Sequence, residues 1–320
     1  MIPLAKTAVL NTHKEIASYH GYTLWKRNPN IGHGGQGWVY RAVLTSKLKV
    51  EELRSKHGGS PDIDNGLDVA LKFYDEELTK GDKSSSYQRI KNELAITQEA
   101  PHFGIVRSYE LCETETSEYR YLFLVMELID GHDLERWMSN QWGNMEAREQ
   151  DVRLVISSLC ESLKHLHDNS VFHRDLKPRN IMIRDDGSVC VMDLGLAKHP
   201  KLPSADTPSK AFFGSIPYSS PQTLRGESYD GADDLYSLGA ILFDMIYYPE
   251  TIFGIYRSTH EGRTLTDLIK AVQEEDPFKL VENRPPIWAN EIWLSLTRKL
   301  LEKQRERRPN CTEVLSSIPR

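Results

Sequence analysis

A change in hydrophobic spacing near Gly131 divides the chain into two regions of different character. Before it, segments rich in β-branched and aromatic residues predict strands at 22–25, 37–43, 68–73 and 121–126. After it, apolar residues recur at helical spacing over 152–166, 235–245 and 292–302. A chain of 320 residues is too long for one small core and fits two lobes of unequal size. The prediction is an α+β fold with a small, mostly β lobe and a larger, mostly helical lobe.

The same spacing predicts the domain limits. We expect the β lobe at 22–128 and the helical lobe at 129–320. The stretch 44–68 is long and polar for a hairpin, so we interpret it as an insertion with a helical turn at 50–56. Residues 1–21 show no clear element and are expected to form a tail or a helix docked on the small lobe.

One amphipathic helix is expected inside the β lobe. From Ser86 to Gln98, Ile90, Leu94 and Ile96 recur among charged residues. The following Pro101 cannot continue a helix, so we expect the helix to end just before it.

Composition excludes several classes of protein. With 39% hydrophobic and 27% charged residues the chain resembles an ordinary globular protein, and its net charge of −6 is spread along the sequence. We therefore expect no nucleic-acid surface. No apolar run reaches the roughly 20 residues that a membrane span needs, so we expect no membrane insertion. Four scattered cysteines show no metal spacing and indicate a reducing compartment. The start Met1–Leu4 lacks a signal-like pattern, and we expect a cytoplasmic location.

The stretch 173–180, with the sequence HRDLKPRN, carries the strongest chemical signal. Asp175 can orient an incoming hydroxyl, and Lys177 can neutralise charge on a transferring phosphate. Asn180 and the later Asp193 offer the hard oxygen ligands that Mg²⁺ prefers. A plain polar turn rarely contains these four groups in this order, so the stretch predicts phosphoryl transfer to a hydroxyl.

A glycine cluster at 31–37 and a downstream lysine predict a nucleotide site. Because a strand rather than a helix follows the glycines, Gly32, Gly34 and Gly37 suit a flap over ATP better than a dinucleotide turn. On the next strand Lys72 can reach phosphates if a carboxylate holds its ammonium. We expect Glu93 to be that carboxylate, and its alternative is Glu99, which stands beside the proline that ends the helix.

These motifs together resemble the eukaryotic-type (Hanks-type) serine/threonine protein kinases from about residue 22 to the C-terminus. The same family shows later landmarks that this chain also has, namely Gly214-Ser215, Ser220-Pro221-Gln222, Asp234 to Gly239 and Arg308-Pro309. The resemblance implies a bilobal protein-kinase fold with an ATP cleft and an activation segment at 193–222.

The resemblance also implies roles for residues around the nucleotide. An apolar sandwich around adenine would be formed by Ile31, Val39, Ala70 and Met182. Met126 would guard the back of the pocket, Glu127 and Leu128 would offer hinge backbone groups, and Asp133 would bind the ribose. Lys177 marks serine/threonine specificity, and Arg174 marks control by phosphorylation in the activation segment, with Ser204, Thr207 and Ser209 as acceptors.

Three departures from the family pattern concern regulation. Leu194 replaces the commoner Phe and keeps an apolar side chain beside Asp193. Gln222 stands where a glutamate usually pairs with the arginine equivalent to Arg308, so we expect a weaker anchor. Thr97 and Ser108 stand where larger apolar side chains usually support the helix that bears Glu93. Support from residues 1–21 or from 44–68 would compensate.

The leading hypothesis is a kinase that transfers the γ-phosphate of ATP to Ser or Thr of protein substrates, with Mg²⁺, or Mn²⁺ as a substitute. Lys72, Glu93, Asp175 and Lys177 are its predicted catalytic residues, and Asn180 and Asp193 its metal ligands. Autophosphorylation within a homodimer is a further expectation. The alternatives are a pseudokinase, which commonly loses one of these residues, and a small-molecule kinase, which generally lacks this activation segment.

Overall fold

The computed structural model of the chain describes residues 2–26, 30–34, 37–57, 67–77, 85–115, 119–141, 145–199, 216–252, 254, 264–283 and 289–319. Two compact units divide the chain. The first comprises Met1–Pro101 and Val106–Ile129, and the second comprises His102–Ile105 and Asp130–Arg320. The short segment His102–Ile105 belongs to the second unit because Gly104 accepts hydrogen bonds from Val191 N, at 2.8 Å, and Ser162 Oγ, at 3.2 Å.

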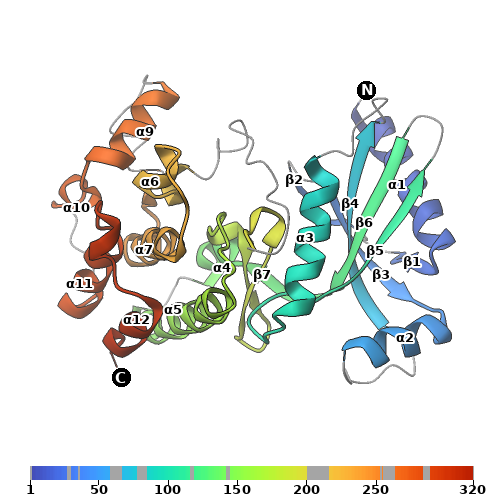
Figure 1. Ribbon diagram of the computed structural model, residues 1–320, viewed down its shortest axis with the longest axis horizontal. Coiled ribbons are helices and arrows are strands. Elements are labelled where there is room, and N and C mark those ends of the chain that lie inside the picture. Colours follow the sequence, from blue (N-terminus) through green and yellow to red (C-terminus); the bar gives the residue numbers. More distant parts are fainter. Residues whose placement is uncertain are drawn as a thin grey trace. The chain divides into compact units, whose positions relative to one another are not determined.

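An antiparallel sheet forms the centre of the first unit (Figure 1). Its strands lie in the order β1-β3-β4-β6-β5, and β2 also pairs with β3. Their bounds are β1 Tyr22–Leu24, β2 Asn30–Gly34, β3 Gly37–Leu44, β4 Leu67–Glu77, β5 Ser108–Glu115 and β6 Tyr119–Glu127. The helices of this unit are α1 Ile2–Tyr19, α2 Lys47–His57 and α3 Ser85–Glu99.

Opposite faces of this sheet carry different helices (Figure 1). Side chains alternate along a strand, so Leu71 and Phe73 of β4 face one side and Tyr74 the other. The first side packs against apolar residues of α1 and α2, including Ile16 and Leu53. The second side packs against α3. The sheet is therefore the middle layer of three.

The second unit is mostly helical. Its helices are α4 Leu134–Gln141, α5 Met145–Asp168, α6 Pro221–Leu224, α7 Gly231–Tyr247, α9 Leu265–Glu274, α10 Pro277–Leu280, α11 Glu291–Leu300 and α12 Cys311–Ser317. A small sheet joins β7 Gly131–Asp133, β8 Ile181–Arg184 and β9 Val189–Val191. The rows of apolar residues on α5 and α7 that the sequence predicts form the main core, where they surround the buried Trp293. Within the described residues, no helix is long and apolar enough to cross a membrane.

The α+β prediction is confirmed, as are the four predicted strands of the first unit and helix α3. Of the two alternatives expected for residues 1–21, the structure shows the helix, α1, and it adds the strands β2 and β5, which the sequence patterns did not indicate. The turn expected at 50–56 is part of the longer helix α2. Neither α1 nor α2 lies on the α3 side of the sheet, so the suggestion that they support α3 is wrong for direct packing on that face.

Candidate active site

Three predicted residues meet in the loop before β8. The Lys177 Nζ lies 2.6 Å from Asp175 Oδ2, and Asn180 Nδ2 donates to the same oxygen at 3.1 Å. Asn180 Nδ2 also donates to the Asp175 carbonyl at 2.8 Å. Pro178 at the first position of the 3₁₀ helix η1, Pro178–Asn180, fixes the turn that returns Asn180 to Asp175. The carboxylate of Asp175 is thus fixed in orientation and lies beside a cation.

The two predicted metal ligands are linked by the backbone. Met192 N donates to the Asn180 carbonyl at 2.8 Å, and Asp193 follows directly in the chain. Asp193 has φ 61° and ψ 69°, a left-handed conformation that is uncommon outside glycine. Because the amide nitrogen of Asn180 is committed to Asp175, its side-chain oxygen is the atom suited to a cation. The donor set of one amide oxygen and one carboxylate fits a hard divalent metal.

One buried carboxylate, Asp234 at the start of α7, holds the backbone before Asp175. Its oxygens accept hydrogen bonds from the backbone N–H groups of His173 and Arg174, each at 3.0 Å. They also accept from Tyr229 Oη at 2.7 Å and contact His167 Nε2 at 2.9 Å. Arg174 has a φ of 70°, which costs roughly 1–3 kcal/mol in a non-glycine residue. The bonds to Asp234 stabilise this strained loop.

The charge of Asp234 is matched by His167. Burial alone would raise the pKa of Asp234, but the hydrogen bond and charge of His167 hold it below its usual value. Burial likewise acts to lower the pKa of His167, and the hydrogen bond to Asp234 outweighs it, with a further contribution from Cys311, so that the pKa rises to about 10. The pair is therefore ionised near neutral pH.

The predicted ion pair of the first unit is present. Lys72 Nζ lies 3.7 Å from Glu93 Oε2, and Glu93 is 1% exposed. Tyr74, two residues along β4, donates to the same carboxylate at 3.4 Å, and its ring lies 5.2 Å from the Lys72 ammonium. The alternative partner Glu99 is exposed at the end of α3. Glu93 is thus the carboxylate that faces Lys72.

Strands β2 and β3 contain the predicted glycines, and position 37 at the start of β3 requires a glycine for steric reasons. Gly37 has a φ of +134°, and a Cβ there would lie 1.8 Å from the Phe73 carbonyl oxygen. No other residue fits without moving the backbone of β3 away from β4. Gly32 and Gly34 lie on β2, which pairs with β3. Gly35 and Gln36 fall outside the described residues.

The residues predicted to contact adenine divide between the units. In the first, Ala70 and Met126 are buried cross-strand neighbours on β4 and β6, and Val39 is partly buried on β3. Ile31 on β2 is 45% exposed. Glu127 uses its backbone N–H in a 2.8 Å bond to the Arg107 carbonyl. The Glu127 N–H is therefore already used within the first unit, and the backbone group that Glu127 could offer to adenine is its carbonyl. Leu128, the other predicted hinge residue, belongs to the same unit.

In the second unit, the predicted ribose and adenine residues are neighbours. Asp133 of β7 pairs directly with Met182 of β8. Asp133 Oδ1 accepts from Arg136 N at 2.9 Å, which also caps the first turn of α4. No pattern in the chain predicted that the Asp133 carboxylate would both end β7 and cap a helix.

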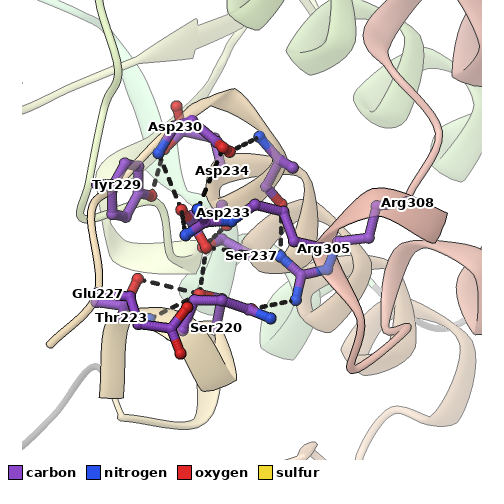
Figure 2. Close-up of polar contacts among 12 residues, drawn as sticks. Ser220, Thr223, Glu227, Tyr229, Asp230, Asp233, Asp234, Ser237, Arg305 and Arg308 are labelled. Atoms are coloured by element: carbon purple, nitrogen blue, oxygen red, sulfur yellow. Dashed lines mark hydrogen bonds and ion pairs between the residues drawn. The ribbon is translucent and has the colours of Figure 1, made fainter. Parts of the chain in front are cut away.

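Asp233, a residue that the sequence reasoning missed, anchors the segment that leads into α6. Asp233 is fully buried and accepts from Arg305 Nη2 at 2.8 Å, while Arg308 Nη1 lies 3.5 Å away. Ser220, which caps α6, donates a short hydrogen bond to the same carboxylate. Figure 2 shows these groups converging on Asp233. The predicted acceptors Ser204, Thr207 and Ser209, and the landmark Gly214-Ser215, lie outside the described residues.

Gln222 is bonded at both ends of its amide. Its Oε1 accepts from Arg308 Nη2 at 2.5 Å, and its Nε2 donates to the Lys303 carbonyl at 2.8 Å. The charge that a glutamate would supply to Arg308 comes instead from Asp233. The spacing of Asp230 and Asp233 is typical of a capping box at a helix start, but only the fold shows that both arginines reach Asp233.

The comparisons with known proteins agree with this geometry. Residues 61–318 match the protein kinase domain family. Serine/threonine-protein kinase PknB of Mycobacterium leprae is 35% identical over 58% of this chain and 29% of its own length. Serine/threonine-protein kinase cds1 of Schizosaccharomyces pombe is 28% identical over 79% of this chain and 53% of its own. Serine/threonine-protein kinase Nek10 of Homo sapiens is 33% identical over 90% of this chain and 22% of its own length.

The chain spans about half or less of the length of these curated relatives. The family match covers most of the chain, including the loop of Asp175 and the anchor of Asp233, and begins after α1 and α2. The chain belongs to the protein kinase domain family.

Proposed function

We propose that the chain is a serine/threonine protein kinase that transfers the γ-phosphate of ATP to Ser or Thr of protein substrates. The observation that carries the proposal is the arrangement of Asp175, with Lys177 at 2.6 Å and Asn180 at 3.1 Å. Asn180 fixes the Asp175 carboxylate through Oδ2, so that the other carboxylate oxygen, Oδ1, can accept a hydrogen bond from a substrate hydroxyl. Lys177 then offers positive charge beside the transferring group.

In the reaction, the substrate oxygen forms a bond to the γ-phosphorus and the bond to the β–γ bridging oxygen breaks. The hydroxyl proton passes to Asp175, and ADP is the leaving group. Lys72, held by Glu93, would bind the non-reacting phosphates. Asn180 and Asp193 would hold Mg²⁺, or Mn²⁺ in its place, and that ion would screen the phosphate charge when bound. Phosphate and water oxygens would complete the coordination of that ion.

The assignments that accompany this function are also proposals. We assign the N-lobe to 22–128, the C-lobe to 129–320 and the activation segment to 193–222. Autophosphorylation between two copies would modify Ser204, Thr207 or Ser209. All four cysteines are free, which is typical of the reducing cytoplasm that we propose as the compartment.

Phosphate transfer to a basic protein tests the proposal. Labelled ATP, the protein and Mg²⁺ are combined, and the labelled amino acids are identified after hydrolysis. Phosphoserine or phosphothreonine is expected, and chelation of the metal should abolish transfer until Mg²⁺ or Mn²⁺ is restored.

Lys72→Met should reduce transfer by at least about 100-fold, because the lysine charge would hold the non-reacting phosphates and so position the γ-phosphate for transfer. Lys91→Met removes an exposed lysine of α3 and serves as the matched control. Equal transfer by Lys72→Met and Lys91→Met would contradict the proposal, as would transfer to tyrosine alone.

A further inference from the structure

Helix α1 covers the face of the first unit's sheet that lies opposite α3 (Figure 1). Its apolar side chains Ile16 and Ala17 are 8% and 0% exposed, and Leu10 packs partly against the same cluster. The family match begins at residue 61, so α1 lies outside it. A role for α1 must therefore be derived from its own contacts.

A single buried histidine joins α1 to strands β3 and β4. His13 is 1% exposed, and its Nδ1 lies 3.0 Å from the Tyr40 hydroxyl of β3. Its ring stacks on Phe73 of β4, with centroids 4.2 Å apart and planes inclined by 19°. Tyr121 of β6 meets the same ring edge-on at 6.4 Å. One side chain thus contacts three adjacent strands, through a hydrogen bond and aromatic packing.

The strand register places these contacts next to Val39 and Lys72, which are predicted to bind the nucleotide, but on the other face of the sheet. Val39 pairs with Lys72 across β3 and β4, between the pairs Tyr40–Leu71 and Trp38–Phe73. Because side chains alternate, Val39 and Lys72 point to the face opposite His13. His13 therefore contacts Phe73, next to Lys72, and Tyr40, next to Val39, on the opposite face of the sheet from the Lys72 and Val39 side chains.

We propose that His13 is a positioning residue for ATP binding, acting through Tyr40 and Phe73 on the Val39–Lys72 pair. This inference rests on the proposed function, which makes that pair part of the nucleotide site. The stack fixes the pleat of β4 beside Lys72, and the hydrogen bond fixes β3 beside Val39. Loss of either contact frees the strand pair to shift at the point where it must meet the nucleotide.

Nucleotide affinity and steady-state kinetics of His13 variants test the inference. His13→Ala should raise the KM for ATP, and the Kd of a nonhydrolysable ATP analogue, by about three- to tenfold, the size expected for loss of an aromatic contact. The KM for the protein substrate should change less than about twofold, since Asp175 lies in the other unit. Lys14→Ala, at an exposed neighbouring position of α1, is the matched control and should leave both constants unchanged.

Two conservative variants separate the contacts. His13→Phe keeps a ring on Phe73 and loses the bond to Tyr40, whereas His13→Asn keeps a polar group near Tyr40 and loses the stack. Each should restore part of the affinity lost in His13→Ala. A purely structural role would lower the folded fraction, and hence kcat, with no change in the KM for ATP or in the Kd.

An unchanged Kd for the analogue in folded His13→Ala would overturn the inference. That result is distinguishable from failure of the proposed function, because Lys72→Met would still abolish transfer. If Lys72→Met kept full activity, the proposed function itself would fail, whatever the behaviour of His13.

Discussion

At the scale of single residues, Asp233 shows how one carboxylate can anchor a segment. Its side chain is fully buried, as is that of Arg308, and Arg305 adds a second cation at 2.8 Å. Burial lowers the pKa of Arg308, and the charge of Asp233 opposes that shift. The cost of burying these charges is offset only while all of them remain paired and hydrogen-bonded.

Asp233→Asn should therefore destabilise the protein strongly. The substitution leaves two arginines without their buried anion, and removal of one partner of such a pair costs about 3–5 kcal/mol. Chemical denaturation measures the change in unfolding free energy. Asp230→Asn is the control, because Asp230 is 47% exposed in its side chain and asparagine is also a good N-cap. Equal losses in both variants would contradict the assigned role of Asp233.

At the scale of the element, the seam between α3 and β5 contains an unusual polar group. Ser108 at the start of β5 is 0% exposed, and its hydroxyl has no hydrogen-bond partner among the described residues. Thr97 on α3 is also buried, but its hydroxyl donates to the Leu94 carbonyl at 3.0 Å. The two small polar side chains at this seam are thus not equivalent.

Ser108→Ala should stabilise the protein by about 1 kcal/mol, because a buried hydroxyl without a partner carries a desolvation cost. Thermal unfolding of the variant should show a higher midpoint than the unsubstituted protein. Thr97→Ala removes a bonded hydroxyl and should lower the midpoint. A lower midpoint for Ser108→Ala would show that the hydroxyl contributes more than its contacts indicate.

Elements whose apolar residues recur at a regular spacing could be predicted from the sequence. Elements in which apolar and polar residues are mixed without one period were left open, as α1 was, or missed, as β5 was. The rows on α5 and α7 are long and apolar, so their helical period stands out. The buried stripe of α1 contains His13 between Leu10 and Ile16, and a histidine counts as polar until its partners are known. Strand β5 has the sequence SYELCETE, whose glutamates pair with Lys49 and Arg120 only after folding.

The candidate site follows the same distinction. Local order in the chain was enough to predict that Asp175, Lys177 and Asn180 would meet, because a short turn joins them. The pairing of Lys72 with Glu93 was expected because Glu93 lies within the predicted helix, whereas the alternative Glu99 stands beside the proline that ends it. Asp233 and Arg305 are separated by more than 70 residues, and no local pattern links a capping acid to a distant arginine.

At the scale of the whole molecule, stability should depend on pH through His167 and Asp234. The pKa of His167 is raised from 6.5 to about 10 in the folded protein. Its stabilising contribution is therefore complete below pH 6.5 and is lost as the pH rises through about 10. Asp234 has a lowered pKa, so its contribution is present above its unfolded value of 3.8 and is lost as the pH falls below it.

His167→Gln should remove the alkaline part of this dependence. Near pH 7 the variant should be less stable by about 2 kcal/mol, the usual value of a hydrogen bond to a charged group. The difference should shrink as the pH approaches 10, in unfolding curves recorded at each pH. His165→Gln on the same helix is the control. A difference that stays constant between pH 6 and pH 10 would contradict the ionised pair.

In the proposed function, Asp175 directs the transfer of phosphate from ATP to Ser or Thr. Mass spectrometry of the protein after exposure to ATP and Mg²⁺ measures whether Asp175 has this role. The unsubstituted protein and Asp186→Asn, which changes an exposed acid in the turn after β8, should acquire phosphate on Ser or Thr. Asp175→Asn should acquire at least about 100-fold less. Equal phosphate on Asp175→Asn, or none on any of the three proteins, would contradict the account.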